Sequence, residues 1–255
     1  MSIKKIKNSI LESLPRPLAK QLYLVRNSES VITSKAYKNY HFDLAVPKRN
    51  QLWVDRLQKP NGHEPAICEW FEKYLTDKDV YVDVGSAFGF FPALISQMHP
   101  KVKIHAFEAG WQQFYFLTKN AKACENGTAW TIQNKYIGNQ NNQTTVRLDD
   151  YCESNGFTPS VIQIDVDGAE NEVLSGAKEI INKGQTEFLL ELHPLILGDF
   201  NTSVEEVLAN FKDKYEMKIL PDLRNNNMIW SNDLSLIERD DNPYLYIYPS
   251  NKARF

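Results

Sequence analysis

Short apolar runs alternate with segments of helical periodicity through most of the chain. An apolar run of four to eight residues is typical of a strand buried on both faces, whereas apolar residues every three or four positions indicate a helix. The strand-like runs are VYVDVG, KIHAFEA, VIQIDVDG and EFLLELHP, and the helical segments between and after them are FPALISQM, WQQFYFLTKNAKA, ENEVLSGAKEII and VEEVLANFKDKY. Strands joined by helices of crossover length predict a doubly wound, mostly parallel α/β sheet.

The two ends of the chain depart from this alternation. Near the C-terminus, YEMKILP and PYLYIYP have no obvious helix between them, which predicts an antiparallel pair at the sheet edge. Before the alternating region, a helix is expected over Ala66 to Leu75, with Pro65 in its first turn. Short irregular strands or loops are expected over Val31 to Trp53. We therefore predict an N-terminal extension, residues 1–62, packed on a domain of residues 63–255.

The first residues predict a basic amphipathic helix. Between Ile3 and about Leu22, apolar residues recur at helical spacing among lysines and arginines. Such a helix could rest on anionic lipid as a peripheral membrane contact. The alternative is a helix that packs its apolar side on the domain or on a second subunit of a homo-oligomer.

Composition narrows the class of protein. The 255 residues are 42% hydrophobic and 24% charged, which is typical of a folded globular chain. The net charge of -3 and the lack of a basic patch in the central region argue against nucleic-acid binding. Three widely spaced cysteines suggest neither a zinc site nor a disulfide framework, and no apolar run is long enough for a membrane span or signal peptide. A soluble, cytoplasmic protein is expected.

Doubly wound sheets bind ligands beyond the carboxyl ends of their strands, so the residues at each strand end are the candidates for a site. The first strand end and the turn after it read Asp83-Val84-Gly85-Ser86-Ala87-Phe88-Gly89. Asp83 is placed to accept hydrogen bonds from a ligand, and Gly85, Ser86, Ala87 and Gly89 form a turn whose backbone can approach it closely. The dinucleotide fingerprint G-x-G-x-x-G is absent, because Ala87 and Phe88 occupy the inner positions. The alternative is that the glycines serve turn geometry alone.

The second strand ends in Phe107-Glu108-Ala109. An acidic residue about twenty positions after a glycine turn is placed to accept hydrogen bonds from both hydroxyls of a ribose. The alternative is an exposed carboxylate stabilised by the dipole at a helix N-terminus. Together with the glycine turn, Glu108 favours ribose binding.

The third strand end is the most distinctive. A wholly apolar approach, VIQI, leads to Asp165, Asp167 and Glu170 in the segment DVDGAE, and burying such charge without a function would be costly. Asp149 and Asp150 lie upstream, and His193 follows the next strand. These groups could converge on one pocket. Structurally, Asp165 or Asp167 could instead cap the following helix, and His193 could be a core imidazole with its hydrogen bonds satisfied.

This combination resembles the FkbM family of S-adenosylmethionine-dependent methyltransferases. The motifs that carry the resemblance are DVGSAFG, Phe107-Glu108, Leu148-Asp149-Asp150, DVDGAE and Glu191-Leu192-His193, in that order, over roughly Glu64 to Pro194. It implies a class I methyltransferase fold, Rossmann-like with an antiparallel last strand, and S-adenosylmethionine bound by Asp83, the glycine turn, Glu108 and Asp149. The sequence departs from the family where Ser86-Ala87 replaces Ala-Asn, Ala109 replaces proline and Asp167 replaces glutamate.

The function expected from these features is methylation of an oxygen of a sugar, glycan or small molecule. Methyl transfer needs an aligned acceptor and removal of the hydroxyl proton. Asp165 or Asp167 is expected to accept that proton or to hold a divalent cation such as Mg²⁺, with Glu170 and His193 as second candidates. Trp53, Trp70, Trp111 and Trp230 could stack on a sugar, although core packing is the simpler role. A nicotinamide-dependent oxidoreductase and a non-catalytic binding module are the alternatives.

Overall fold

The computed structural model describes residues 18, 29–48, 50–59, 62–124, 130–221, 229–237 and 242–251. Across this part of the chain a seven-stranded sheet runs in the order β10-β11-β9-β8-β3-β4-β5. Its strands are β3 (Val80–Val84), β4 (Lys103–Phe107), β5 (Trp130–Gln133), β8 (Val161–Ile164), β9 (Glu187–Glu191), β10 (Tyr215–Leu220) and β11 (Tyr244–Pro249). The strand order reverses between β3 and β8, which makes this the doubly wound architecture that the sequence predicted.

The sheet is parallel except at one edge. The strands from β5 through β4, β3 and β8 to β9 pair in parallel, and β11 pairs antiparallel with both β9 and β10. The predicted antiparallel pair at the sheet edge, including the antiparallel last strand, is therefore confirmed. Its two strands lie side by side, and the described residues between them contain only a short 3-10 turn.

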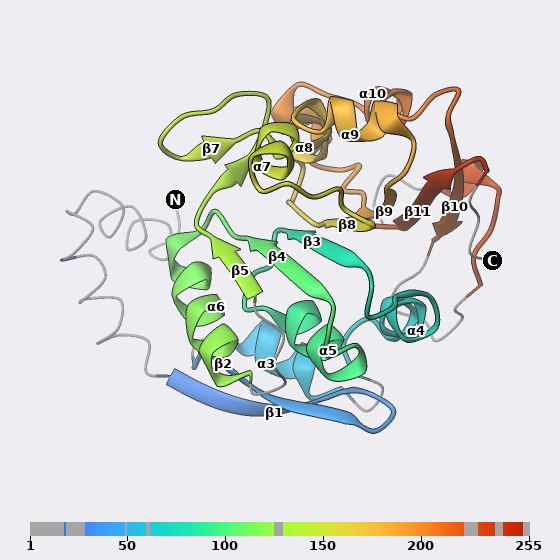
Figure 1. Ribbon diagram of the computed structural model, residues 1–255. Coiled ribbons are helices and arrows are strands. Elements are labelled where there is room, and N and C mark those ends of the chain that lie inside the picture. The colour runs from blue at the N-terminus through green and yellow to red at the C-terminus, as the bar shows by residue number, and fades with distance from the viewer. Residues whose placement is uncertain are drawn as a thin grey trace, which may run out of the picture.

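Helices cover both faces of the sheet (Figure 1). One face carries α4 (Pro65–Tyr74), α5 (Phe90–Met98) and α6 (Trp111–Ala123), and the other carries α7 (Leu148–Ser154), α8 (Glu170–Ser175), α9 (Lys178–Lys183) and α10 (Val204–Ala209). Each face has its own apolar core, centred on residues such as Phe71 and Leu94 on the first and Leu174 and Phe211 on the second. Buried on both faces, the strands need the continuous apolar runs seen in the sequence.

The N-terminal region is more regular than the sequence predicted. Instead of irregular strands, β1 (Glu29–Tyr37) and β2 (Tyr40–Pro47) form an antiparallel hairpin, followed by α3 (Gln51–Leu57). The hairpin lies outside α5 and α6 (Figure 1), and its buried Leu44 and Val46 join the core of that face. A strand that packs on helices with one face only needs apolar side chains on that face alone, which explains the mixed sequence of the hairpin. The predicted helix from Ile3 to Leu22 lies outside the described residues, apart from Leu18.

Four further features differ from the sequence prediction. The segment expected to form one helix, ENEVLSGAKEII, forms α8 and α9, which are separated at Gly176, where a β-carbon would lie 2.1 Å from the carbonyl oxygen of Gly138. The strand β5 and the helix α7 were not predicted. The expected loop at 134–143 contains β6 (Tyr136–Ile137), which pairs in parallel with β7 (Thr145–Val146). Short 3-10 turns, η1 (Leu197–Phe200) and η2 (Leu234–Leu236), complete the described elements.

Among the described residues, no helix combines the length and apolarity that crossing a membrane requires.

We predict that the hairpin depends on one buried amide. The Asn120 side chain donates to the carbonyl oxygens of Ala45 (3.0 Å) and Phe88 (2.8 Å) and accepts from the amide of Ala45 (2.8 Å). Asn120→Ala leaves these buried groups unpaired and should lower the free energy of unfolding by about 2 to 4 kcal/mol in urea titrations. Asn155→Ala, whose exposed amide donates only to the Tyr151 carbonyl, is the control. Equal losses in the two variants would contradict the prediction.

Candidate functional site

A cleft opens at the carboxyl ends of β3, β4 and β8, where the strand order reverses. It encloses about 360 Å³, which is within the range of small-molecule sites. Its lining comes from the turns after these three strands, from the end of β9, from α3 and from the segment around β6: Trp53, Arg56, Val84, Gly85, Ala87, Phe107, Glu108, Ala109, Gln113, Lys135, Tyr136, Ile137, Asp165, Val166, Asp167, Ala169, Val173, Glu191, His193, Phe200 and Asn242. Predicted strand ends far apart in the sequence thus share one cavity.

At the floor of the cleft, the backbones at the ends of β3 and β8 lie very close together. A β-carbon at Gly85 would lie 1.7 Å from the carbonyl oxygen of Asp165, and Gly85 has a φ of +94°. The amide of Asp165 donates to the carbonyl of Val84 over 3.0 Å, and the amides of Gly85 and Ser86 donate to the carbonyl of Phe107. Only glycine is compatible with this geometry. The turn therefore brings β3, β4 and β8 together at their tips.

Glu108 forms the wall of the cleft beyond β4. Its Oε2 accepts a hydrogen bond of 2.9 Å from the amide of Ala87, and its Oε1 accepts one of 2.6 Å from the amide of Gly110. Ala87 holds a φ of +47°, which turns its amide toward this carboxylate. Burial raises the pKa of Glu108 to about 7, against the lowering effect of these two amides. The carboxylate is thus fixed in place and retains lone pairs for a ligand.

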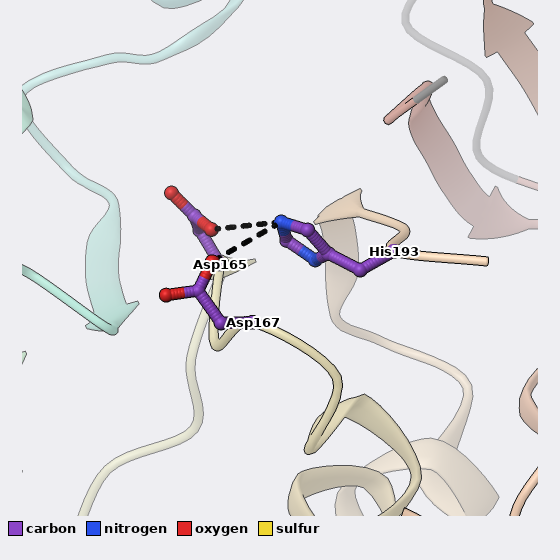
Figure 2. Close-up of side chains that lie close together, drawn as sticks. All are labelled: Asp165, Asp167 and His193. Atoms are coloured by element: carbon purple, nitrogen blue, oxygen red, sulfur yellow. Dashed lines mark ion pairs between the residues drawn. The ribbon is translucent and has the colours of Figure 1, made fainter. Parts of the chain in front are cut away.

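Asp165, Asp167 and His193 meet at the opposite side of the cleft. In Figure 2 both aspartates point to the same ring nitrogen of His193. Its Nε2 lies 3.7 Å from Asp165 Oδ1 and 3.6 Å from Asp167 Oδ1. The Asp167 side chain is 91% exposed and Asp165 is 38% exposed, so the group is accessible from solvent. Asp167 has a φ of +48°, a left-handed conformation uncommon outside glycine.

Glu170 fixes the orientation of the His193 ring. The carboxylate of Glu170 is fully buried, and its Oε1 accepts a hydrogen bond of 2.6 Å from His193 Nδ1. This bond leaves Nε2 on the side of the two aspartates. Burial alone would lower the pKa of His193, but the bond to Glu170 and the charges of Asp165 and Asp167 outweigh it and raise the pKa. Neither aspartate caps α8, so that structural alternative is not observed.

Two further carboxyl groups lie beside this side of the cleft. Glu191, at the end of β9, has its Oε1 3.8 Å from His193 Nε2, and Glu64, with a side chain 13% exposed, lies at the start of α4. Burial and mutual repulsion raise the pKa of Asp165 and of Glu191. Carboxyl groups gathered in this way favour a bound cation or shared protons.

Several lining residues were not predicted as site residues from the sequence. Arg56 comes from α3, in the segment expected to be irregular, and Lys135 and Tyr136 come from the expected loop. Trp53, which was expected to stack on a sugar or to pack in the core, also comes from α3. Trp53 packs edge-on against Phe88 with ring centroids 5.3 Å apart, so it combines core packing with access to the cleft. No local motif marks these residues. Only the tertiary structure, which places these residues around one cleft, shows that they belong to the site.

Four predicted cofactor-binding residues do not line the cleft. Ser86 is buried, and its hydroxyl donates to the carbonyl of Asp83 over 3.0 Å. Gly89 faces Leu117 and Trp130, and Asp83 is buried beneath the turn. The carboxylate of Asp149 accepts hydrogen bonds from the amides of Glu179 (3.1 Å) and Ile180 (3.0 Å) at the start of α9. The structure therefore places Asp149 as a helix-capping residue rather than beside the cleft.

A comparison with family models matches residues 95–216 to the methyltransferase FkbM domain, which confirms the resemblance seen in the motifs. The matched range begins within α5 and ends in β10. It includes the motifs around Glu108, Asp149, Asp165 and His193 and excludes the glycine turn, whereas the motifs themselves extend over roughly Glu64 to Pro194. No curated protein sequence matches the chain.

Comparison with solved structures shows the fold. A structure of a fibrillarin/Nop5p complex matches with a TM-score of 0.50 at 16% identity, covering 86% of this chain and 93% of that chain. A candidate S-adenosylmethionine-dependent methyltransferase from Streptococcus mutans has a TM-score of 0.50 at 10% identity, and the match covers 87% of this chain and 55% of that chain. Methyltransferase FkbM from Methylobacillus flagellatus has a TM-score of 0.48 at 16% identity, covering 70% and 48%. This chain thus spans about half the length of that protein. The fold is that of the class I methyltransferases.

We predict that buried Asp83 makes thermal stability depend on pH. Burial raises the pKa of Asp83 to about 7, above the value of about 3.9 in an unfolded chain. The folded state therefore binds the extra proton, and stability falls as pH rises from about 4 through about 7. Between pH 6 and pH 8 this amounts to about 1 kcal/mol, or roughly 2 to 4 °C in Tm.

Calorimetry of the wild type and Asp83→Asn at both pH values tests this prediction. In the variant, the contribution of Asp83 to the difference in Tm between pH 6 and pH 8 should be absent. Asp199→Asn removes an exposed aspartate and is the matched control, with the wild-type pH dependence expected. An unchanged pH dependence in Asp83→Asn would contradict the prediction.

Proposed function

Because residues 95–216 match the methyltransferase FkbM domain, we propose that this chain transfers the methyl group of S-adenosylmethionine to a hydroxyl oxygen of a sugar, a glycan or a small molecule. The domain and the class I fold support the methyltransferase class. The choice of an oxygen acceptor rests on the groups that face the cleft. One observation carries the proposal: Glu108 and the Asp165, Asp167 and His193 group lie on opposite sides of the same cleft.

The Glu108 side of the cleft fits the nucleoside of the donor. The carboxylate of Glu108 is held by the amides of Ala87 and Gly110, and its remaining lone pairs can accept hydrogen bonds from the two ribose hydroxyls. The base can lie against Tyr136 and Ile137, which line the cleft from β6. Pyrophosphate binding would need inner glycines in the turn, and Ala87 and Phe88 occupy those positions.

The charges of the cleft fit the remainder of the donor. Four carboxyl groups, Glu108, Asp165, Asp167 and Glu191, line it together with the cations Arg56 and Lys135 and with His193. S-adenosylmethionine carries a positive sulfonium, an ammonium and a carboxylate. Glu108, Asp165 and Glu191 favour the two cationic centres, whereas solvent screens the charge of Asp167, whose side chain is 91% exposed. Arg56 or Lys135 can pair with the carboxylate.

The proposed methyl transfer takes place on the side of the cleft opposite Glu108. The donor supplies an electrophilic methyl group, so a bond forms from the acceptor oxygen to the methyl carbon as the carbon–sulfur bond breaks, and S-adenosylhomocysteine leaves. The hydroxyl proton must also leave, and Asp165, Asp167 and His193 face the cleft where they can promote its removal. Glu170 holds the His193 ring in a single orientation. Alignment of the reactants supplies much of the remaining rate enhancement, on the order of 7 to 11 kcal/mol in well-oriented cases.

We predict that Glu108 controls donor binding. Glu108→Gln should weaken S-adenosylmethionine binding in calorimetric titrations, because a neutral amide presents a single oxygen in place of the carboxylate. In the wild type, a pKa of about 7 for Glu108 should weaken binding on the order of tenfold from pH 8 to pH 6, since the ionised form accepts the ribose hydrogen bonds. Glu108→Gln should have a shallower pH dependence.

The same titrations separate the alternatives. Glu172→Gln, an exposed change on α8, is the control and should bind the donor as the wild type does. Binding of NAD in place of S-adenosylmethionine would favour an oxidoreductase and contradict the proposal. Binding of S-adenosylmethionine without methyl transfer to any acceptor in a broad panel would favour a non-catalytic binding module.

We predict that Asp167 acts in transfer and not in donor binding. Asp167→Ala should retain donor affinity and reduce methyl transfer to hydroxyl acceptors by about 10² to 10⁴-fold, the range of a lost acid–base group. The assay follows radioactive methyl transfer from labelled S-adenosylmethionine into a panel of sugars, alcohols, amines and thiols. Asp199→Asn is the matched control. Full turnover by Asp167→Ala, or transfer confined to amines and thiols, would contradict the proposal.

A further inference from the structure

The group formed by Asp165, Asp167 and His193 has the form of a metal site. One ligand atom from each side chain lies within 4.8 Å of the other two. Two ligand atoms about 2.1 Å from a shared ion are at most about 4.2 Å apart. The distances of 3.6 Å and 3.7 Å from His193 Nε2 to the two carboxylates satisfy that limit. Because the Asp167 side chain is 91% exposed, a small rotation can bring its oxygen closer to Asp165.

Hydrogen bonding among the three residues does not account for this arrangement. Both distances from Nε2 exceed the range of a hydrogen bond. A single N–H on Nε2 could also serve only one of the two carboxylates. Nε2 and two carboxylate oxygens therefore converge at ion-pair distances without hydrogen bonds among them, an arrangement that a single cation bound in place of the Nε2 proton would complete.

The surroundings of His193 supply a second, independent feature. Histidine ligands of metals usually donate their other ring N–H to a carboxylate, which fixes the tautomer and strengthens the ligand. Glu170 is fully buried, and its Oε1 accepts a hydrogen bond from His193 Nδ1 at 2.6 Å. Its Oε2 is buried with no hydrogen-bond partner in the part of the chain that the structure describes. A buried carboxylate with an unpaired oxygen is costly without a positive charge nearby, and either the imidazolium form of His193 or a metal ion bound to its ring supplies that charge.

We propose that Asp165, Asp167 and His193 bind one divalent transition-metal ion, with Glu170 as the residue that orients the histidine ligand. The imidazole changes the ion expected from the sequence. Carboxylates alone would favour Mg²⁺, whereas two carboxylates and one imidazole suit Mn²⁺, Co²⁺ or Zn²⁺. Three protein ligands leave positions for water and for an acceptor oxygen on the cleft side. This inference deepens the proposed function, because an ion there would acidify the hydroxyl that is methylated.

The test is metal binding by the full chain, purified without a polyhistidine tag and stripped with a chelator. Mn²⁺ is titrated and the free ion is followed by electron paramagnetic resonance, and Co²⁺ binding is followed by its visible absorption. The wild type should bind one ion per chain, and His193→Ala should lose this binding. Glu170→Gln should bind 10 to 100-fold more weakly, the range for a lost orienting partner.

Two further variants keep the result interpretable. Asp167→Asn should fold, because asparagine tolerates the left-handed conformation of this exposed residue, and it should bind the ion more weakly. Glu172→Gln makes the same chemical change as Glu170→Gln on the exposed side of α8 and should leave the affinity unchanged. No stoichiometric binding by the wild type, or equal affinity in the wild type and the His193 and Glu170 variants, would overturn the proposal.

Titration of the same stripped samples with S-adenosylmethionine separates this inference from the proposed function. Donor binding without metal binding overturns the metal site and leaves the methyltransferase proposal standing. Metal binding without donor binding supports the site and contradicts the methyltransferase proposal.

Discussion

The close approach of β3 and β8 at their carboxyl ends is the constraint on which the rest of this structure depends. The carbonyl oxygen of Asp165 lies 1.7 Å from the position that a β-carbon of residue 85 would take. Glycine at this position lets the two strands pair to their tips, so the turn after β3 and the segment after β8 border one cleft. A larger residue would force the two tips apart and separate the groups that face each other across the cavity.

The convergence of strand ends has an electrostatic cost. Glu108, Asp165 and Glu191 all lie where burial raises the pKa of a carboxyl group. Unrelieved, these charges destabilise the fold at neutral pH, and a cationic ligand relieves them. The same feature is the physical basis for the two proposals, a sulfonium donor on one side of the cleft and a metal ion on the other. Left-handed conformations at Ala87 and Asp167 occur at the same two places, which is typical of functional sites.

The fold was largely predictable because the strands are buried on both faces and the helices on one. The runs at Val80, Val161 and Glu187 are continuous and apolar, and the structure confirms each as a parallel strand. The hairpin β1–β2 was read as irregular because it packs on helices and exposes its outer face, which gives a mixed sequence. The break between α8 and α9 was also missed. It lies at Gly176, which packs against the backbone of Gly138, a contact between segments far apart in the sequence.

By itself, the sequence determined the alternation of strands and helices, the antiparallel edge and the chemical types at each strand end, since these follow from local apolar periodicity and from turn residues. Tertiary structure alone decided which of those residues face the cleft. It placed Asp149 at the start of α9, buried Asp83 below the turn, and brought Arg56 and Trp53 from a segment without a motif. It also joined Glu170 to His193, because that hydrogen bond depends on the register of two neighbouring strands and the helix that follows the first. Periodicity records which side of an element is apolar, but distances between side chains on different elements are fixed only by packing.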